Sequence, residues 1–268
     1  MFSHGREKHF RFFPLVGYTG AVTEGGSLPP HPDLPRYYAE GEKSHFVQGI
    51  FDSSAAHYER VEKLMALGSG SWYRRRALRR HGFPHGERGL DVAVGTGLVA
   101  REILRLAPNG FQLLGLDPSL GMLQQTRKCS RLLAVAARGE KLPFPKETFS
   151  CLTMGYALRH LSDLTVTFQE FHRVLKSGGK LLVLEITPPC RGLGRLLLRT
   201  YIRGFTATAA QLLFCQKKTA ELWRYFWDTM EACVPPEVVL DSLDAAGFTA
   251  VSRFVELGIF SEYTAVKL

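Results

Sequence analysis

The sequence lacks several features that mark specialised classes of protein. Its five cysteines among 268 residues are scattered, with no Cys-x-x-Cys pair and no histidine at metal-ligand spacing from any of them. We therefore expect no disulfide framework and no metal site, but free thiols in a reducing compartment. No apolar run approaches the length of a membrane span, and no signal peptide is evident. These absences predict a soluble protein of the cytoplasm.

Charge is plentiful but unevenly distributed. The net charge is +9, yet residues 1–50 carry five basic and five acidic side chains. Residues 188–225 carry seven basic side chains and a single acidic one, Glu221. A localised basic surface favours an acidic partner such as a phosphate group, a membrane or a nucleic acid, although a solvated face is the commoner cause.

The stretch 89–97, Gly-Leu-Asp-Val-Ala-Val-Gly-Thr-Gly, combines a short buried strand with a glycine turn. The apolar residues that follow recur with a period of about 3.6, which predicts a helix. Glycines let backbone N–H groups approach a ligand, and a helix N-terminus favours electron-rich atoms. Strand, glycine turn and helix form the first unit of a doubly wound nucleotide fold, but a tight turn without a ligand would look the same.

A second apolar strand, 111–116, ends at Asp117, roughly 20 residues past the glycine turn, where a carboxylate can accept hydrogen bonds from a ribose diol. Asp117 could also cap the next helix, and both roles are compatible, but we favour the ribose role. Three more strands are predicted at 132–136, 149–154 and 180–186. The helix at 164–175 should close on the glycines that follow Lys176 as a C-cap.

The C-terminal segment predicts a helix at 236–246, followed by strands at 251–257 and 260–267. Because the turn at Gly258 is tight, these two strands must be antiparallel. The fold class is therefore α/β: a Rossmann-like doubly wound sheet, mostly parallel, with a C-terminal antiparallel hairpin. Its ligand crevice should lie at the carboxyl ends of the strands.

The remaining segments suggest a simple domain organisation. Residues 1–45 are rich in glycine, proline and histidine, which predicts a partly ordered N-terminal arm. Residues 46–268 are predicted to form one domain, in which an insertion at 188–236 covers the substrate. Helices are predicted within residues 45–80, where we interpret the run Arg74 to Arg76 as a solvated helix face.

Four segments in order resemble the class I S-adenosylmethionine-dependent methyltransferases, and most of all the C-methyltransferases of ubiquinone and menaquinone biosynthesis. These segments are Met65–Gly68 with Trp72–Leu78, Leu142–Pro145, Ala157–Leu161 and Val174–Glu185. The similarity runs from about Phe51 to Lys267. It implies a class I methyltransferase fold, S-adenosyl-L-methionine as the cofactor and methyl transfer as the activity.

The resemblance also implies a cofactor site at the strand ends. Its expected members are Tyr58, Asp91, Ala93, Gly95, Thr96, Gly97, Asp117, Met122, Arg138, Gly139 and Gly155. By position, the residues after the first strand border the methionine moiety, Asp117 holds the ribose hydroxyls, and Tyr58 forms a lid. Arg138 and Gly139 fall where the family contacts the adenine.

Three positions depart from the family pattern. Val94 stands where the quinone family has glycine, and a β-branched residue is incompatible with positive φ. Leu98 replaces an acidic residue and so removes a charge near the cofactor ammonium. Arg138 replaces an acceptor for the adenine amino group, whereas a guanidinium only donates. Either its side chain points away and the backbone contacts the adenine, which we favour, or cofactor affinity is reduced.

Methylation of a ring carbon needs a cationic or hydrogen-bonding group near the ring oxygen and a base for the ring proton. Arg159 and His160, after the fourth strand, and Glu185, at the end of the fifth, are the catalytic candidates. Each has a structural alternative. Arg159 could form an ion pair that holds the sheet, and Glu185 could be the carboxylate that orients it.

The leading hypothesis is C-methylation of a hydroxylated aromatic or quinone-type small molecule. The alternatives are O-, N- or C-methylation of another small metabolite, or a methyltransferase-like scaffold without transfer activity. A nucleic-acid substrate is not favoured, because neither an RNA-binding module nor an Asn-Pro-Pro-Tyr-like base pocket is visible.

Four arginines at a spacing of four could form a ridge on one helix face: Arg191, Arg195, Arg199 and Arg203. Such a ridge could rest on anionic lipid, which predicts peripheral membrane contact. A solvated face, or a grip on a phosphorylated substrate, would explain it equally. A homodimer is an open alternative to a monomer.

Overall fold

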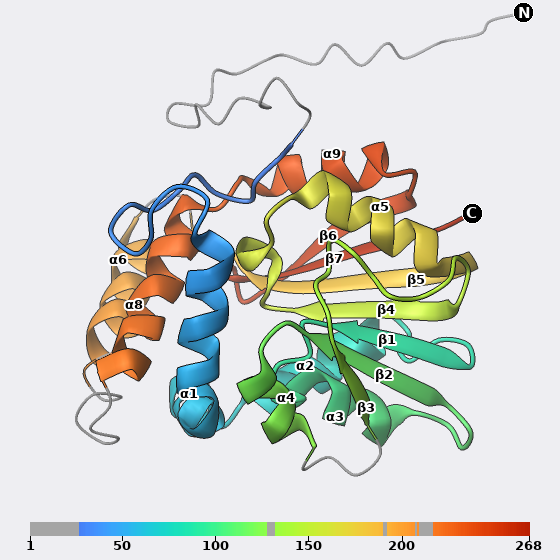
Figure 1. Cartoon of the computed structure of the whole chain (residues 1–268), viewed down its shortest axis with the longest axis horizontal. Coiled ribbons are helices and arrows are strands. Elements are labelled where there is room, and N and C mark those ends of the chain that lie inside the picture. The colour runs from blue at the N-terminus through green and yellow to red at the C-terminus, as the bar shows by residue number, and fades with distance from the viewer. Residues whose placement is uncertain (1–26, 128–131, 190–191, 207, 209–216) are drawn as a thin grey trace, which may run out of the picture.

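A seven-stranded sheet with the order β3-β2-β1-β4-β5-β7-β6 forms the centre of the chain (Figure 1). The computed structural model describes residues 27–127, 132–189, 192–206, 208 and 217–268. The first five strands pair in parallel, and β7 is antiparallel to both β5 and β6. The strands are β1 (Arg88–Val92), β2 (Gln112–Asp117), β3 (Leu133–Ala136), β4 (Phe149–Gly155), β5 (Leu175–Ile186), β6 (Thr249–Glu256) and β7 (Phe260–Val266). The predicted fold class, including the antiparallel hairpin, is confirmed.

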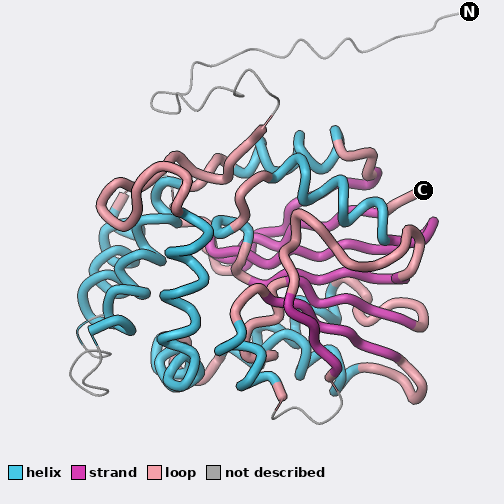
Figure 2. Tube along the Cα trace, viewed as in Figure 1, coloured by secondary structure: helices cyan, strands magenta, loops and turns pink. Residues whose placement is uncertain are grey.

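Helices lie against this sheet, and a further group of helices stands at one end of it (Figure 2). The α-helices are α1 (Lys43–Met65), α2 (Gly70–Arg80), α3 (Leu98–Leu106), α4 (Leu120–Thr126), α5 (Leu164–Val174), α6 (Leu193–Arg199), α8 (Lys217–Ala232) and α9 (Pro236–Ala245). A short 3₁₀ helix, η1 (Leu158–His160), follows β4, and a π-helix, η2 (Thr200–Thr206), continues α6. None of the helices in the described part of the chain has both the length and the apolar character needed to span a bilayer.

The central strands are buried on both faces because their apolar residues serve two separate cores. In β5, Leu181 and Val183 pack with α5 and α9, whereas Leu182 and Leu184 pack with α2 and α3. Successive side chains of a strand point to opposite faces, so an unbroken apolar run is what a doubly covered strand requires. This arrangement holds the carboxyl ends of β1, β4 and β5 in fixed register.

A third core joins segments that are far apart in the sequence. Its members come from the N-terminal segment, α1, η2 and α8, and include Tyr38, Val47, Ile50, Val61, Ile202, Leu222, Trp223 and Phe226. Figure 1 shows α1 and α8 side by side at the end of the sheet, with α6 on the outer side of α8. This helical cap covers the edge at which the parallel strands end.

Residues 27–42 fasten this cap to the sheet domain. The carbonyl of Leu28 accepts a hydrogen bond from the backbone N–H of Leu164, 2.9 Å away, and the carbonyl of Pro30 accepts one from Val234 at 2.8 Å. The hydroxyl of Tyr37 donates to Asp228 of α8 at 2.6 Å. This part of the predicted arm is therefore packed, whereas residues 1–26 lie outside the described residues.

The end of α5 differs from the prediction. The expected glycine C-cap is wrong, because α5 ends at Val174 and Leu175 is already extended, with φ −73° and ψ 142°. Leu175 begins β5 and pairs with Phe149, and the N–H of Gly178 donates to the carbonyl of Lys267 at 2.8 Å. Pairing with distant strands therefore outweighs the local preference of the glycines for a helix end.

Candidate active site

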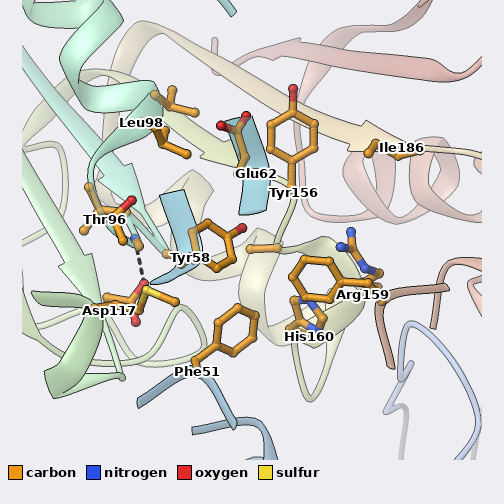
Figure 3. Close-up of a pocket in the computed structure, with 18 of the residues that line it drawn as sticks. Phe51, Tyr58, Glu62, Thr96, Leu98, Asp117, Tyr156, Arg159, His160 and Ile186 are labelled. Atoms are coloured by element: carbon orange, nitrogen blue, oxygen red, sulfur yellow. Dashed lines mark hydrogen bonds between the residues drawn. The ribbon is translucent and has the colours of Figure 1, made fainter. Parts of the chain in front are cut away.

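A cavity of about 280 Å³ lies between the strand ends and the helical cap (Figure 3). Asp91, Asp117 and Gly155 line it from β1, β2 and β4, and Tyr58 and Phe226 line it from α1 and α8. The strand order reverses between β1 and β4, and loops that diverge at such a switch point leave a crevice. The cavity therefore lies where the fold class predicts a ligand.

The turn after β1 brings backbone to the wall of this cavity. Positive φ falls on Ala93 (53°) and Gly95 (55°), and Val94 is not among the residues with positive φ. The side chain of Val94 packs over Gly115, where an added Cβ would lie 3.0 Å from Val94 Cγ1. The valine is therefore accommodated by a glycine on the neighbouring strand, and the concern about its backbone conformation does not arise.

Asp117 is a carboxylate held in place by the backbone. Its Oδ2 accepts a hydrogen bond from the N–H of Gly95 at 2.8 Å, the dashed line in Figure 3, and its Oδ1 accepts one from Ser119 at 2.8 Å. Burial raises the pKa of Asp117 to about 6. Each oxygen of an ionised carboxylate can accept a further hydrogen bond, so a diol can be held here.

Two buried polar side-chain atoms near this turn have no hydrogen-bond partner in the described part of the chain. Asp91 Oδ1 accepts a hydrogen bond from Thr153 at 2.6 Å, but Asp91 Oδ2 and Thr96 Oγ1 have no partner among the described residues. Burial also raises the pKa of Asp91 to about 7. Unsatisfied buried polar groups in a native structure call for a ligand or water. The set of a carboxylate, a hydroxyl and turn amides fits a ligand with ammonium and hydroxyl groups.

Helix α1 is anchored over the cavity by Asp52. Its Oδ1 accepts hydrogen bonds from the hydroxyl of Ser119 at 2.6 Å and from the N–H of Gly121 at 2.8 Å, at the start of α4. Further along α1, the ring of Tyr58 stacks on Trp223 of α8, with centroids 6.1 Å apart. Tyr58 is thus held against α8 at the cavity wall, and its role as a lid stays a prediction.

At the other end of the cavity, Arg159 forms a buried ion pair with Glu185. Their side chains are only 2% and 5% exposed, and Glu185 Oε1 also accepts the N–H of Ile186 at 2.9 Å. The guanidinium lies 4.8 Å from the ring centroid of Phe226. Burial raises the pKa of Glu185, and Arg159 opposes that shift. Arg159 lines the cavity, and Glu185 lies behind it.

His160 lies among aromatic rings beside Arg159 (Figure 3). It stacks on Tyr225 at 5.5 Å between centroids and meets the edge of Phe51 at 5.2 Å. Neither ring nitrogen has a hydrogen-bond partner within the described chain. Burial and the charge of Arg159 hold the pKa of His160 well below its usual 6.5. The imidazole is therefore neutral, with one ring nitrogen a donor and the other an acceptor, and the residue lines the cavity.

The comparison with known proteins identifies the family. The sequence profile of the ubiE/COQ5 methyltransferase family matches residues 39–267. The chain belongs to the ubiE/COQ5 methyltransferase family. As a member of it, the chain is an S-adenosyl-L-methionine-dependent methyltransferase, and the predicted enzyme class and cofactor are confirmed.

Individual proteins agree with the family assignment. The ubiE/COQ5 chain is 31% identical to the ubiquinone/menaquinone biosynthesis C-methyltransferase of Serratia proteamaculans, over 82% of this chain and 89% of that protein. It is 30% identical to the demethylmenaquinone methyltransferase of Bacteroides fragilis, over 89% of this chain and 99% of that protein. A methyltransferase structure from Thermotoga maritima shares the fold, with a TM-score of 0.58, 20% identity, and coverage of 82% of this chain and 99% of that one.

The structure brings most of the predicted ubiE/COQ5 site residues to one cavity. Every expected cofactor residue except Gly97 is among the described residues that line it. Gly97, with φ 87°, instead is the N-cap residue immediately before α3 and faces Thr126 and Leu132. Arg138 is exposed at the cavity, and Met122 is buried there. Of the catalytic candidates, Arg159 and His160 line the cavity, whereas Glu185 is not among its lining residues in the described chain.

Several cavity residues were not predicted. Glu62 of α1, Arg74 of α2, and Trp223 and Phe226 of α8 all line the cavity. The interpretation of Arg74 as part of a solvated face is wrong, because its side chain is 3% exposed and paired with Glu62. The spacing of Trp223 and Phe226 by three within a basic segment was the available signal for an aromatic helix face. For Arg74 the signal was the apolar pair Ala77 and Leu78, three and four residues later on the same helix face.

The affinity of this ubiE/COQ5 chain for its cofactor should rise with pH. Asp117 and Asp91 have pKa values of about 6 and about 7 in the ligand-free protein. If the ionised forms accept the ribose hydroxyls and attract the ammonium, affinity is lost as pH falls through those values and is constant above them. Titration calorimetry with S-adenosylhomocysteine between about pH 5 and pH 8 measures this. A flat profile would contradict it.

Proposed function

We propose that this methyltransferase transfers a methyl group to a ring carbon of a hydroxylated aromatic acceptor of the quinol type. One observation carries the proposal: a buried guanidinium, Arg159, and a neutral imidazole, His160, stand together in an aromatic-walled end of the cavity. The names of the relatives from Serratia proteamaculans and Bacteroides fragilis, both enzymes of quinone biosynthesis, support the same acceptor class.

The cofactor would occupy the wall formed by the strand ends. Asp117 would hold the ribose hydroxyls, Asp91 and Thr96 would border the methionine moiety, and Gly139 would contact the adenine. Their burial, and the unsatisfied atoms of Asp91 and Thr96, suit this assignment. Bound S-adenosyl-L-methionine supplies an electrophilic methyl group on a sulfonium. The protein has to align the acceptor with it and exclude water.

The acceptor would lie between the aromatic side chains of the helical cap and the tip of β4. Phe51 and Tyr58 of α1 and Trp223 and Phe226 of α8 all line the cavity. Flat apolar walls suit a planar ring, and the packing of α1 against α8 keeps bulk water away from it. The aromatic lining favours a ring over a small aliphatic amine.

Arg159 would act on the ring oxygen of the acceptor. A guanidinium near a phenolic oxygen stabilises the phenolate, and the negative charge then reaches the neighbouring ring carbon. Glu185 contacts Arg159 from behind, so we assign it the role of positioning the guanidinium. His160 lines the same end of the cavity, and the unprotonated nitrogen of its neutral imidazole would take the proton that the ring loses as its carbon gains the methyl group.

A panel of acceptors tests the reaction class. The purified protein is incubated with S-adenosyl-L-methionine and hydroquinones, naphthohydroquinones, catechols or aliphatic amines, and the products are identified by mass spectrometry. Methylation of quinols with a free ring carbon is expected. Methylation of amines alone would favour the alternative of another small metabolite, and the absence of any product despite cofactor binding would favour a scaffold.

We also propose that the acceptor is drawn from a lipid surface, because three leucines of α6 are exposed on the surface of the protein. Leu193, Leu196 and Leu197 are 69%, 58% and 60% exposed, whereas Leu198 of the same helix lines the cavity. Two of the four arginines of the predicted ridge are held in ion pairs. Arg195 pairs with Glu231 at 2.6 Å and Arg203 with Asp228 at 3.3 Å, and Arg191 lies outside the described residues. The leucines, with exposed Arg199 beside them, are therefore the lipid-facing group.

Replacing the three leucines of α6 by serine should weaken binding to anionic vesicles by about tenfold or more, because apolar burial holds interfacial helices. Co-sedimentation at low salt measures this. A matched control replaces three other exposed leucines, Leu67, Leu133 and Leu257, which are 80%, 75% and 74% exposed. If the wild-type protein does not sediment with the vesicles, the proposed membrane contact is wrong.

A further inference from the structure

An ion pair between the first two helices forms part of the cavity wall. Glu62 of α1 and Arg74 of α2 both line the cavity, and their side chains are 14% and 3% exposed. Arg74 Nη2 donates to Glu62 Oε1. In Figure 3, Glu62 points into the cavity between Leu98 and Tyr156, on the side away from Arg159 and His160. The pair therefore lies apart from the proposed acceptor end.

One hydrogen-bond donor of this ion pair has no acceptor among the described residues that surround it. Arg74 Nε is buried without a hydrogen-bond partner in the described part of the chain. The guanidinium lies 6.0 Å from the ring centroid of Tyr156, so an aromatic face rather than a second carboxylate flanks it. Gly70 leaves room for the pair, since a Cβ there would lie 2.5 Å from Glu62 Oε1 and 3.1 Å from Arg74 Nη1. A buried charge with an unused donor is costly unless a ligand completes its bonding.

The path of the cofactor leads to this pair. Asp117, the residue placed for the ribose, and Thr96 of the glycine turn lie on one side of Figure 3, and Leu98 and Glu62 follow beyond them. A cofactor whose ribose lies on Asp117 must extend its amino acid end across the β1–α3 turn. The first turn of α3 has no acidic residue. Beside Asp91 of β1, which lines the cavity with its Oδ2 unpaired in the described chain, Glu62 of α1 can therefore supply a second carboxylate for an ammonium.

We propose that Glu62 and Arg74 bind the amino acid end of S-adenosyl-L-methionine, with Glu62 accepting from its ammonium and Arg74 donating to its carboxylate. A zwitterion carries one charge of each sign, which complements a carboxylate and a guanidinium side by side. The inference rests on Asp117 holding the ribose but is independent of the identity of the methyl acceptor. It gives the helices α1 and α2 a role in selecting an intact cofactor over its truncated forms.

Two ligands that differ only at the amino acid end test the inference. S-adenosylhomocysteine carries the zwitterion, whereas 5′-methylthioadenosine keeps the adenine, ribose and thioether but lacks it. Glu62→Gln should weaken binding of S-adenosylhomocysteine by about 10- to 100-fold and change binding of methylthioadenosine by less than about twofold. Titration calorimetry of the full chain measures both constants. Binding of methylthioadenosine also shows that the variant has folded.

The matched control is Glu59→Gln, one turn earlier on α1. Glu59 is 42% exposed, pairs with Arg101 at 2.8 Å and is not among the cavity residues of the described chain. This variant should bind both ligands as the wild type does. If Glu62→Gln does not fold, Arg74→Lys serves in its place, because it keeps the charge but loses the planar fork. It should weaken only the ligand with the zwitterion.

Two results would overturn the inference. An equal loss of affinity for both ligands would mean that the pair only joins α1 to α2. Unchanged affinity for S-adenosylhomocysteine would mean that the amino acid end lies elsewhere. Neither result would bear on the proposed acceptor, since both ligands lack the transferable methyl group of the sulfonium and no acceptor is present.

Discussion

Arg159→Lys should lower kcat by about 100-fold or more, while the Kd for S-adenosylhomocysteine changes by less than about threefold. In our account the planar guanidinium of Arg159 stabilises charge that develops on the acceptor oxygen, so its loss is felt in the transition state and not in cofactor binding. Lysine keeps a positive charge against the buried Glu185, whose side chain is 5% exposed. Single-turnover kinetics and calorimetry measure the two effects separately.

A matched substitution and a second position sharpen this test. Arg101→Lys changes another ion-paired arginine, which is 29% exposed and pairs with Glu59, and it should leave kcat within about twofold. Glu185→Gln should lower kcat less than Arg159→Lys does, because it loosens the guanidinium without removing a donor. An unchanged kcat in Arg159→Lys, or an equal loss of cofactor affinity, would contradict a role in methyl transfer.

Asp117→Asn should raise the Kd for S-adenosyl-L-methionine by about 100-fold. The wild-type carboxylate already accepts two backbone hydrogen bonds, from Gly95 and Ser119, each at 2.8 Å. An amide has only one oxygen, and its NH₂ group would face one of those N–H donors. The ribose diol then loses an ionic acceptor, and the glycine turn loses part of its support.

Asp163→Asn is the control for that substitution. Asp163 caps α5 by accepting a hydrogen bond from the N–H of Val166 at 3.1 Å, and asparagine caps helices equally well. This variant should bind the cofactor as the wild type does. If the Kd of Asp117→Asn stays within about threefold of the wild-type value, Asp117 does not bind the ribose hydroxyls.

The parts of the fold that could be predicted depend on local patterns. The glycine turn after β1, the carboxylate at the end of β2 and the apolar runs of β4 and β5 all lie where the sequence places them. Each depends on a period of two or 3.6 or on a turn residue, which are properties of a few consecutive residues. The strand order then places Asp91, Asp117 and Arg159 around one crevice.

The errors arise where distant segments decide the outcome. The glycines after α5 became part of β5 because Leu175 pairs with Phe149 and Gly178 with Lys267. Arg74 is buried because Glu62, twelve residues earlier, turns towards it from another helix. Neither of these pairings has a local signal. The ion pair of Arg159 with Glu185, by contrast, is the structural alternative that the sequence offered for both residues.

The helical cap could be predicted only in outline. The insertion after β5 was expected to cover the substrate, but the pairing of α1 with α8 joins segments more than 150 residues apart. The contact of Tyr58 with Trp223 that closes the cavity depends on this packing. Helical periodicity shows that each segment has an apolar face, but it does not show which other face will cover it.

The bond formed by the transferred methyl group tests the central claim most directly. The protein is incubated with ¹³C-methyl-labelled S-adenosyl-L-methionine and a hydroquinone that has both a free hydroxyl and a free ring carbon. The ¹³C NMR spectrum of the product separates a methyl group on an aromatic carbon from one on oxygen. We expect an aryl C–CH₃ signal that Arg159→Lys strongly reduces. An O–CH₃ signal alone would contradict it.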